Sequence, residues 1–347
     1  MVVYLSILLT ALVVSWALTG WIRRYALAKS LIDIPNSRSS HSVPVPRGGG
    51  LSVVLVCSIG FVGLWLCDWL ALNEFLALFG AGSIVALVGF LDDHEHVAAR
   101  WRLMVHFIGA IWALVCLGGL PAFPFFHISV ELGIVGYVIA AFYLVWLLNL
   151  YNFMDGIDGI AGLEAMTVLL SAACVLTITH ENGVSQTLIL LLVCMAVAGF
   201  LLWNFPKAKI FMGDACSGFL GLTLGILSLQ AAWNDGVYLW VWLILLGVFI
   251  VDATFTLVRR VLRGEPFYQA HRSHAYQFAS RKYQSHVKVS LGVALLNLFW
   301  LLPVGLCVAL EWIEGFLGVV IAYLPLILLA YKLNAGGREQ DVDVLAS

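Results

Sequence analysis

The sequence predicts an all-α polytopic membrane protein of about eleven transmembrane helices. Of its 347 residues, 62% are hydrophobic and only 11% are charged, and its mean hydropathy is +0.99. A soluble domain of this length does not tolerate such a composition, because its surface needs far more charge. The bilayer is therefore expected to be the solvent of this chain.

Eleven stretches are long and apolar enough to cross a bilayer, which takes about 20 mostly apolar residues. They begin near residues 3, 51, 75, 103, 133, 159, 186, 215, 236, 289 and 313. The first has no basic residue before it and is followed by Arg23 and Arg24, the reverse of a signal peptide, so it should remain as an anchor. We expect a single transmembrane domain over residues 1–335 and a short cytoplasmic tail over 336–347.

The Lys and Arg residues predict the orientation of the chain. All 18 of them follow the first, third, seventh, ninth and eleventh stretches, and the loops on the other side contain none. The N-terminus should therefore lie outside and the C-terminus in the cytoplasm. The expected cytoplasmic loops are 23–50, 92–102, 151–158, 204–214 and 259–288. The net charge of −2 indicates no nucleic-acid partner.

The first two cytoplasmic loops already carry unusual residues. The first ends in Pro44-Val-Pro-Arg47-Gly-Gly-Gly50, which predicts an ordered, turn-rich loop. Asp92 and Asp93 end the third stretch, and adjacent carboxylates repel each other unless a cation or a basic group neutralises them. The alternative is a solvated helix end with ordinary charges. His94 and His96 lack the His-Glu-x-x-His spacing of zinc sites and are interpreted as surface residues.

The fifth stretch ends in a dense polar block, Asn149-Leu-Tyr-Asn152-Phe-Met-Asp155-Gly-Ile-Asp158-Gly. Asn149, Asn152 and Asp155 recur every third residue, so they would share one face of a continuing helix. The two Asp-Gly steps then let the backbone turn and approach a ligand closely. A simple turn between two spans is the alternative, but it does not explain two amides and two carboxylates within ten residues.

Two later groups complete the polar set. Asn204 precedes Phe211-Met-Gly-Asp214, where the carboxylate of Asp214 would lie at a helix start that favours anions; the alternative is that Asp214 only caps that helix. The loop 259–288 carries His271-Arg272-Ser-His274 among many cations. His and Arg at close spacing suit phosphate oxygens better than a transition metal.

These groups together indicate a magnesium-dependent phosphate site on the cytoplasmic face. Carboxylates at membrane depth are costly, so several on one side predict function. Hard oxygen ligands favour Mg²⁺, with Mn²⁺ as a substitute, and Mg²⁺ typically takes one or two carboxylates plus substrate phosphates. The residues therefore predict phosphoryl transfer at the membrane surface.

The four groups, in this order, resemble the bacterial polyprenyl-phosphate N-acetylhexosamine-1-phosphate transferases of the glycosyltransferase 4 family. The resemblance runs from about Asp33 to Gln277 and rests on the Asn-x-x-Asn-x-x-Asp-Gly-x-Asp-Gly block and Met-Gly-Asp214. Asp33-Ile-Pro-Asn-x-Arg-Ser-Ser-His41 and Ala-His271-Arg-Ser-His274-Ala-Tyr-Gln277 look like the branch that initiates O-antigen and other surface polysaccharides. The related phospho-N-acetylmuramoyl-pentapeptide transferase has consecutive histidines that this chain lacks.

The resemblance implies an enzyme of the bacterial inner membrane whose site faces the cytoplasm. Undecaprenyl phosphate would attack the β-phosphorus of a UDP-N-acetylhexosamine, giving a polyprenyl-diphospho-sugar and UMP; direct attack is favoured, and a covalent aspartyl-phosphate route stays open. By analogy a homodimer is expected. The sugar itself is not predicted, because one hydroxyl can set specificity.

The resemblance also implies roles for the site residues. Asp92, Asp93 and Asp214 would be catalytic, and Asp214, Asp92 and Asp155 would hold Mg²⁺. The substrate-binding residues would be Arg47, Asn149, Asn152, Asp155, Asp158, Asn204, Phe211, His271, Arg272 and His274. Phe211 would stack on uracil. The segment that carries His271, Arg272 and His274, which we call the histidine loop, would hold the diphosphate. The resemblance assigns no role to Glu164, which is expected from its position to face a polar cavity or hold the sugar, and Asp252 near the inner end of the ninth stretch is expected to be a pocket residue.

The main alternative is a membrane transporter that uses inner-face acidic residues, since buried acids also mark ion pathways. A transporter predicts acids distributed through the membrane depth and repeated halves, and neither is evident in the sequence. An intramembrane aspartyl protease would need a glycine where Phe211 stands.

Overall fold

The computed structural model describes residues 2–35, 43–95, 97–126, 128–179, 184–266 and 271–338. In its first half the helices are α1 (Val2–Ala28), α2 (Leu51–Leu66), α3 (Leu72–Phe75), the π-helix η1 (Leu76–Ala81), α4 (Gly82–His94), α5 (Ala99–Leu117) and α6 (Gly133–Met154). In its second half they are α7 (Ile160–Thr179), α8 (Val184–Asn204), α9 (Asp214–Asn234), α10 (Val237–Leu245), α11 (Gly247–Leu262), α12 (Ala275–Tyr283), α13 (His286–Leu296), the π-helix η2 (Asn297–Leu301), α14 (Leu302–Ala309) and α15 (Gly315–Lys332). The strands are β1 (Ile32–Asp33), β2 (Val45–Pro46), β3 (Phe123–Phe125) and β4 (Ile128–Val130).

Each of the eleven predicted stretches corresponds to a helix or to a run of joined helices. Within the described residues, nine helices are long and apolar enough to cross a membrane, and the bent pair α10 and α11 makes a tenth. The remaining stretch is α2, an apolar helix of 16 residues. The prediction of an all-α polytopic membrane protein is confirmed.

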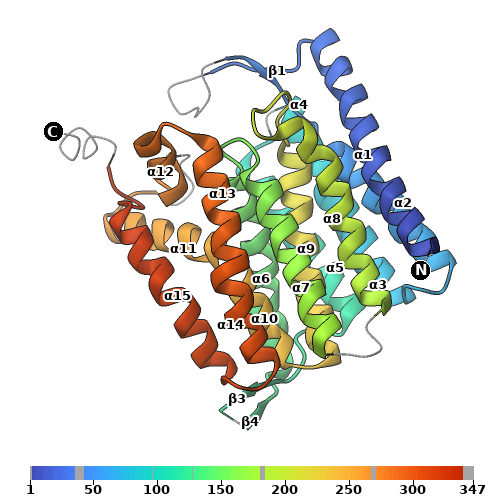
Figure 1. Cartoon of the computed structure of the whole chain (residues 1–347), viewed down its shortest axis with the longest axis vertical. Helices are drawn as coiled ribbons and strands as arrows, with labels where there is room; N and C mark the ends of the chain where they lie inside the picture. Colours follow the sequence, from blue (N-terminus) through green and yellow to red (C-terminus); the bar gives the residue numbers. More distant parts are fainter. Residues whose placement is uncertain are drawn as a thin grey trace.

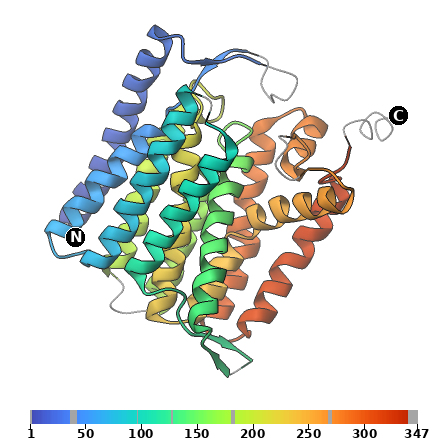
Figure 2. The same cartoon turned by 180° about the vertical axis from the view of Figure 1, so that it is seen from behind.

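The ninth stretch is not the straight span that its hydropathy predicts. α11 is bent by 71° from α10 and runs across the bundle (Figures 1 and 2). α11 carries Asp252, Arg259 and Arg260, and charged side chains are costly inside a bilayer. The bend lets this helix carry charges to the end of the bundle where the polar loops lie.

Helix α9 lies in the middle of the bundle and is buried from Ala215 to Ala232 (Figure 1). It packs against α4 and α6, the helices that end in the predicted acidic motifs. The close approach of α4 depends on Gly89, where a Cβ would lie 2.5 Å from the backbone oxygen of Asp214. A side chain there would push apart the two helices that carry Asp93 and Asp214.

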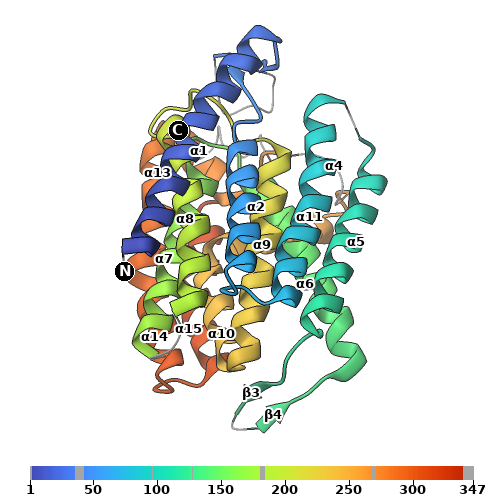
Figure 3. The same ribbon diagram turned by 90° about the vertical axis from the view of Figure 1, so that its right-hand side faces the viewer.

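The polar loops gather at one end of the bundle. β1, β2 and α12 lie there, and the antiparallel β3–β4 hairpin extends from the opposite end (Figures 1 and 3). Several predicted loops begin later than expected, because α1 continues to Ala28, α6 to Met154 and α11 to Leu262. The first cytoplasmic loop contains the paired strands β1 and β2. Arg38 and His41 of the predicted motif, and His96, lie outside the described residues.

Candidate active site

Asp93, at the end of α4, caps the start of α9. Its Oδ1 accepts a hydrogen bond from the backbone N–H of Asp214 (3.1 Å), and its Oδ2 accepts one from Ala215 (3.3 Å). The first N–H groups of a helix lack partners within the helix, and the helix dipole also favours a carboxylate there. Asp214 is therefore the first helical residue and does not serve only as the cap, because Asp93 supplies the cap.

Gly213, just before α9, makes this arrangement possible. Its φ is +85°, in the left-handed region that favours glycine. A Cβ on this residue would lie 2.7 Å from Oδ2 of Asp93. The Met-Gly-Asp motif therefore needs its glycine both for the backbone turn and for the approach of Asp93.

Asp92 is bound to different partners from those of Asp93. Its Oδ2 pairs with Nη1 of Arg102, and its Oδ1 accepts a hydrogen bond from the backbone N–H of Val97 (2.9 Å). The same Nη1 lies 3.3 Å from Oδ2 of Asp214, so one guanidinium bridges two carboxylates. The side chain of Asp92 is 7% exposed and that of Asp214 is 37% exposed. A ligand can therefore reach Asp214. The alternative prediction for Asp92, a solvated helix end with ordinary charges, is wrong because its carboxylate is buried and paired.

The polar block at the end of α6 points toward the same place. Asn149 donates to the carbonyl of Val145 (2.7 Å), and Asn152 donates to Oγ of Ser217 in α9 (3.2 Å). The helix ends one residue before Asp155, which has non-helical torsions (φ −84°, ψ 54°). The predicted common helix face therefore holds for the two amides but not for Asp155, because the chain turns at that residue.

Asp155 lies close to the other carboxylates. Burial first, and then the charges of Asp214, Asp93 and Asp158, raise the pKa of Asp155 to about 7. Carboxylates this close repel one another unless a cation reduces their charge. We call Asp92, Asp93, Asp155 and Asp214 the acidic cluster.

Asn204, at the end of α8, joins two loops of the site. It is 3% exposed; its Oδ1 accepts from the N–H of Gly159 (2.9 Å) and its Nδ2 donates to the carbonyl of Ile210 (2.9 Å). A buried amide that satisfies both its donor and its acceptor in this way fixes the segments that it joins. Asn204 thus holds the turn after Asp158 against the segment that leads into Phe211.

The first cytoplasmic loop docks beside the acidic cluster through its backbone. The N–H of Phe211 donates to the carbonyl of Pro46 (2.8 Å), and the carbonyl of Phe211 accepts from Gly49 (2.9 Å). The ring of Phe211 is half-buried. The exposed Arg47 reaches the carbonyl of Asp93 with its guanidinium. The structure therefore brings the predicted residues Arg47 and Phe211 to the same place as Asp93.

Asp158 contacts the second half of the chain. Its Oδ2 lies 3.3 Å from Nδ1 of His286, the first residue of α13, and its carbonyl accepts from Oγ of Ser290 (2.8 Å). A cavity of about 590 Å³ opens beside this pair, which is in the size range of ligand pockets. We call it the basic cavity; its lining includes Asp158, Lys207, Arg272, Arg281, Ser285 and His286.

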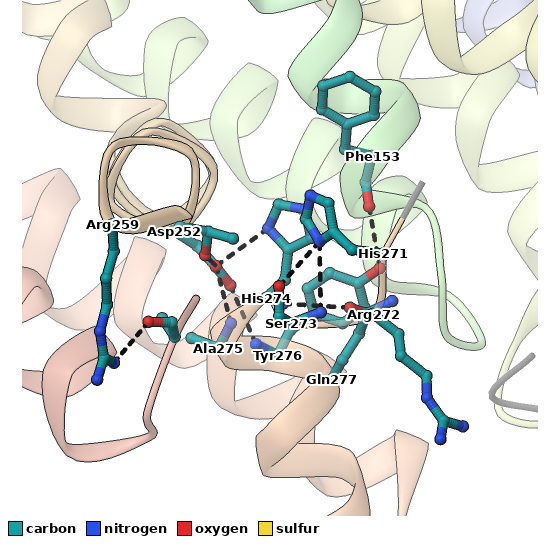
Figure 4. A network of polar contacts seen from close by, with 12 residues as sticks. Phe153, Asp252, Arg259, His271, Arg272, Ser273, His274, Ala275, Tyr276 and Gln277 are labelled. Carbon is teal, nitrogen blue, oxygen red and sulfur yellow. Dashed lines mark hydrogen bonds and ion pairs between the residues drawn. The ribbon is translucent and has the colours of Figure 1, made fainter. Parts of the chain in front are cut away.

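The histidine loop lies beside the end of α6 (Figure 4). The rings of His271 and His274 stack with their centroids 4.9 Å apart. His274 is only 3% exposed, and its Nδ1 lies 3.3 Å from Oδ1 of Asp252. The side chain of Arg272 points away from both imidazoles and lines the basic cavity. The predicted set of three is therefore split between a buried pair of histidines and a cavity wall.

Comparisons with known proteins agree with this geometry. The family described as Glycosyl transferase family 4 matches residues 75–232. A decaprenyl-phosphate N-acetylglucosaminephosphotransferase of Mycobacterium tuberculosis is 30% identical over 329 residues, which cover 83% of this chain and 78% of that protein. The chain belongs to glycosyl transferase family 4.

Two further curated relatives show how far the family likeness extends. A probable undecaprenyl-phosphate N-acetylglucosaminyl 1-phosphate transferase of Bacillus subtilis is 29% identical over 282 residues, 79% of this chain and 75% of that protein. An undecaprenyl-phosphate alpha-N-acetylglucosaminyl 1-phosphate transferase of Yersinia pestis is 25% identical over 331 residues, 90% of this chain and 85% of that protein. The matched family region includes the acidic cluster and ends before the histidine loop.

The acidic cluster of this glycosyl transferase family 4 chain suits a magnesium ion that shares its coordination with phosphate. Among the described residues, no group of three or more His, Cys, Asp or Glu side chains surrounds a single point. Mg²⁺ does not need such a cage, since one or two carboxylates and substrate phosphates commonly suffice. The accessible Asp214 and the neighbouring Asp155 are acids of this kind, whereas both oxygens of Asp93 bind the backbone of α9.

Two residues of the site were not assigned roles from the sequence. Arg102 neutralises Asp92 and Asp214, and His286 pairs with Asp158. Arg102 and His286 lie within predicted cytoplasmic loops, and this position is the sequence feature that could have identified them as site residues. The pairs of Arg102 with Asp214 and of His286 with Asp158 join residues 112 and 128 positions apart, so no local pattern identifies them.

Glu164 does not face the site. It is fully buried in α7, where its Oε2 accepts from Nδ2 of Asn297 (2.6 Å), and the same amide reaches Oγ1 of Thr167 (2.8 Å). The interpretation of Glu164 as a sugar-binding residue is wrong, because its carboxyl joins α7 to η2 inside the bundle. His94, by contrast, is exposed as predicted.

Proposed function

We propose that this protein transfers an N-acetylhexosamine 1-phosphate from a UDP-sugar to undecaprenyl phosphate, which releases UMP and initiates a surface polysaccharide such as O-antigen. The observation that carries the proposal is that one short turn joins the two regions: Asp155 belongs to the acidic cluster, and Asp158, three residues later, lines the basic cavity. The acidic cluster can hold a cation, and the basic cavity can hold the anionic donor. The names of the relatives favour N-acetylglucosamine as the sugar.

The proposed reaction joins two phosphates that repel each other. An oxygen of the lipid phosphate forms a bond to the β-phosphorus of the donor, the bond from that phosphorus to the bridging oxygen breaks, and UMP leaves with the electron pair. A phosphate monoester is already largely ionised at neutral pH, since its second pKa is about 6. Catalysis therefore depends mainly on positioning and on compensating charge.

The residues divide this task in the proposal. Arg272, Arg281 and Lys207 would hold the donor phosphates at the basic cavity, and Asp214 with Asp155 would bind Mg²⁺. The two oxygens of Asp92 bind Arg102 and the N–H of Val97, so Asp92 would hold that guanidinium beside Asp214. When bound, the ion would neutralise phosphate charge. Asp93 would act by fixing α9, because its carboxylate is occupied by two N–H groups.

The charges support a site that faces the cytoplasm of the bacterial inner membrane. All Lys and Arg residues follow alternate spans, and such residues collect on the cytoplasmic side. UDP-sugars are cytosolic, and the acceptor phosphate would lie at the inner headgroup level.

The test is UMP release by the purified protein in detergent from a panel of UDP-N-acetylhexosamines. The assay is run with and without undecaprenyl phosphate and Mg²⁺, and with Asp214→Asn beside Asp235→Asn as a control at the opposite end. We expect release that needs both lipid and metal, is abolished in Asp214→Asn and persists in the control. Well-folded protein that releases no UMP from any donor would contradict the proposal, and ion flux in liposomes would then test the transporter alternative.

A further inference from the structure

Asp252 occupies the same kind of position at α12 that Asp93 occupies at α9. It lies in the bent helix α11 and is 6% exposed. Its Oδ1 accepts from the N–H of Ala275 (2.8 Å), and its Oδ2 accepts from the N–H of Tyr276 (3.0 Å) (Figure 4). These are the first two residues of α12. A buried carboxylate therefore caps this short helix from another element of the chain.

The same carboxylate also contacts the buried histidine. Oδ1 of Asp252 lies 3.3 Å from Nδ1 of His274, and a carboxylate oxygen can only accept, so the proton of this contact belongs to Nδ1. The ring is also stacked against His271 and Tyr276, with centroids 4.9 and 5.8 Å away. Both the tautomer and the orientation of His274 are thereby defined.

Helix α12 in turn contacts the polar block at the end of α6. Oη of Tyr276 donates to the carbonyl of Phe153 (3.0 Å), two residues before Asp155. The ring of Phe153 also lies over that of His274, with centroids 6.5 Å apart. The position of α12 and the path of the chain into the acidic cluster are therefore coupled.

We propose that Asp252 is a positioning residue that holds α12, whose Ser280 and Arg281 line the basic cavity, and that fixes the proton of His274 on Nδ1. The proposal rests on the proposed transferase function. It assigns a role to a residue outside the matched family region, which ends at residue 232. Partners that orient a functional histidine typically change activity by about 10- to 100-fold when they are removed.

The test compares Asp252→Asn with Asp252→Ala. Asparagine has a similar size but only one acceptor oxygen, so it cannot accept from the N–H groups of Ala275 and Tyr276 at once, and its amide NH₂ must face an N–H of α12 or Nδ1 of His274. We expect Asp252→Asn to lower the melting temperature in detergent less than Asp252→Ala does and to raise the donor KM about tenfold or more. Asp252→Ala should show the same kinetic defect together with a lower Tm. Nitrogen-15 NMR of the histidines should show the His274 tautomer change in Asp252→Asn.

A matched control is Asp235→Asn, because Asp235 also caps a helix, α10, through the N–H of Val237 (3.0 Å), but at the other end of the bundle. The activities of the wild-type protein and of Asp235→Asn test the transferase function separately from the role of Asp252. If both are active while Asp252→Asn keeps the wild-type KM and the wild-type His274 tautomer, the positioning role is wrong. A folded Asp252→Asn must also lose little more when His274→Ala is added, because the two residues act as one unit. Additive losses would overturn the proposal.

Discussion

The acidic cluster and the basic cavity lie at the same end of the bundle but are built differently. The acidic cluster is formed by the ends of packed transmembrane helices, and its acids are fixed by backbone N–H groups and by Arg102. The basic cavity is formed by a turn between α12 and α13 and by the segment after α8, and longer cationic side chains line it.

This difference predicts two kinds of sensitivity. In the acidic cluster a small steric change alters the positions of several charges, because helix packing sets those positions. In the basic cavity the loss of one cation removes attraction for an anion but leaves the packed helices intact. Substitutions in the first region should therefore affect folding and turnover together, and those in the second should affect donor binding alone.

The largest effect is expected for Gly213→Ala. The added Cβ would collide with Asp93 and would also occupy a left-handed backbone conformation, so the variant should lose about 2–4 kcal/mol of stability and most of its activity. Thermal unfolding in detergent and UMP release measure the two effects. Gly48→Ala is the control, since Gly48 has φ +89° but open space around its Cβ. Equal losses in both variants would show that contact with Asp93 is unimportant.

A pH dependence of metal binding should follow from Asp155. Its pKa is raised from 3.8 to about 7, so the acid is largely protonated below pH 7 and protons compete with Mg²⁺ there. The apparent Mg²⁺ affinity should fall by up to about tenfold for each pH unit below 7. Mg²⁺ titrations of UMP release between pH 5.5 and 8 test this, and Asp155→Asn should flatten the profile.

The stability of the metal-free protein should depend on pH in the opposite direction to the Mg²⁺ affinity. The folded state keeps the Asp155 proton up to about pH 7, whereas the unfolded chain loses it near 3.8, so stability should decrease as pH rises from about 4 to 7. Metal-free melting curves that instead gain this stability with pH, and lose the gain in Asp155→Asn, would contradict the assignment.

In the basic cavity, Arg281→Ala should raise the donor KM about tenfold and leave kcat nearly unchanged, since one charge contact to phosphate is lost. Its Tm should fall only slightly, because the guanidinium also donates to the carbonyl of Arg272 and lies over the ring of Phe278. The neighbouring Lys282→Ala is the control: Lys282 is exposed, lies over the ring of Tyr283 and does not line the cavity. An equal KM change in both variants would mean that the effect comes from general surface charge.

The smallest effect should come from salt. Raising NaCl from about 0.05 to 0.5 M should increase the donor KM by about two- to fivefold. Salt screens the solvent-accessible cations of the basic cavity over about 10 Å or less at these ionic strengths. The melting temperature at fixed pH should change little, since the contacts of the acidic cluster are buried. A salt effect that is larger on stability than on KM would reverse the comparison between the two regions.

Sequence reasoning found most of the site but misjudged how individual residues act. It placed Asp92, Asp155, Asp158 and Asp214 on one side, and the structure brings them to one end. It could not separate Asp92 from Asp93, because the two have the same chemistry and adjacent positions. On a helix they point roughly 100° apart, so one meets Arg102 and the other meets the start of α9.

The sequence by itself determined that this is a polytopic membrane protein with acidic and basic motifs on one face. Hydropathy and the alternation of charged loops express the cost of moving each segment into lipid, and that cost is a local property. Only the tertiary structure decided the pairings Asp93 with α9, Asp158 with His286 and Asp252 with His274. Those contacts depend on how distant helices pack and on where α11 bends, which no local pattern contains.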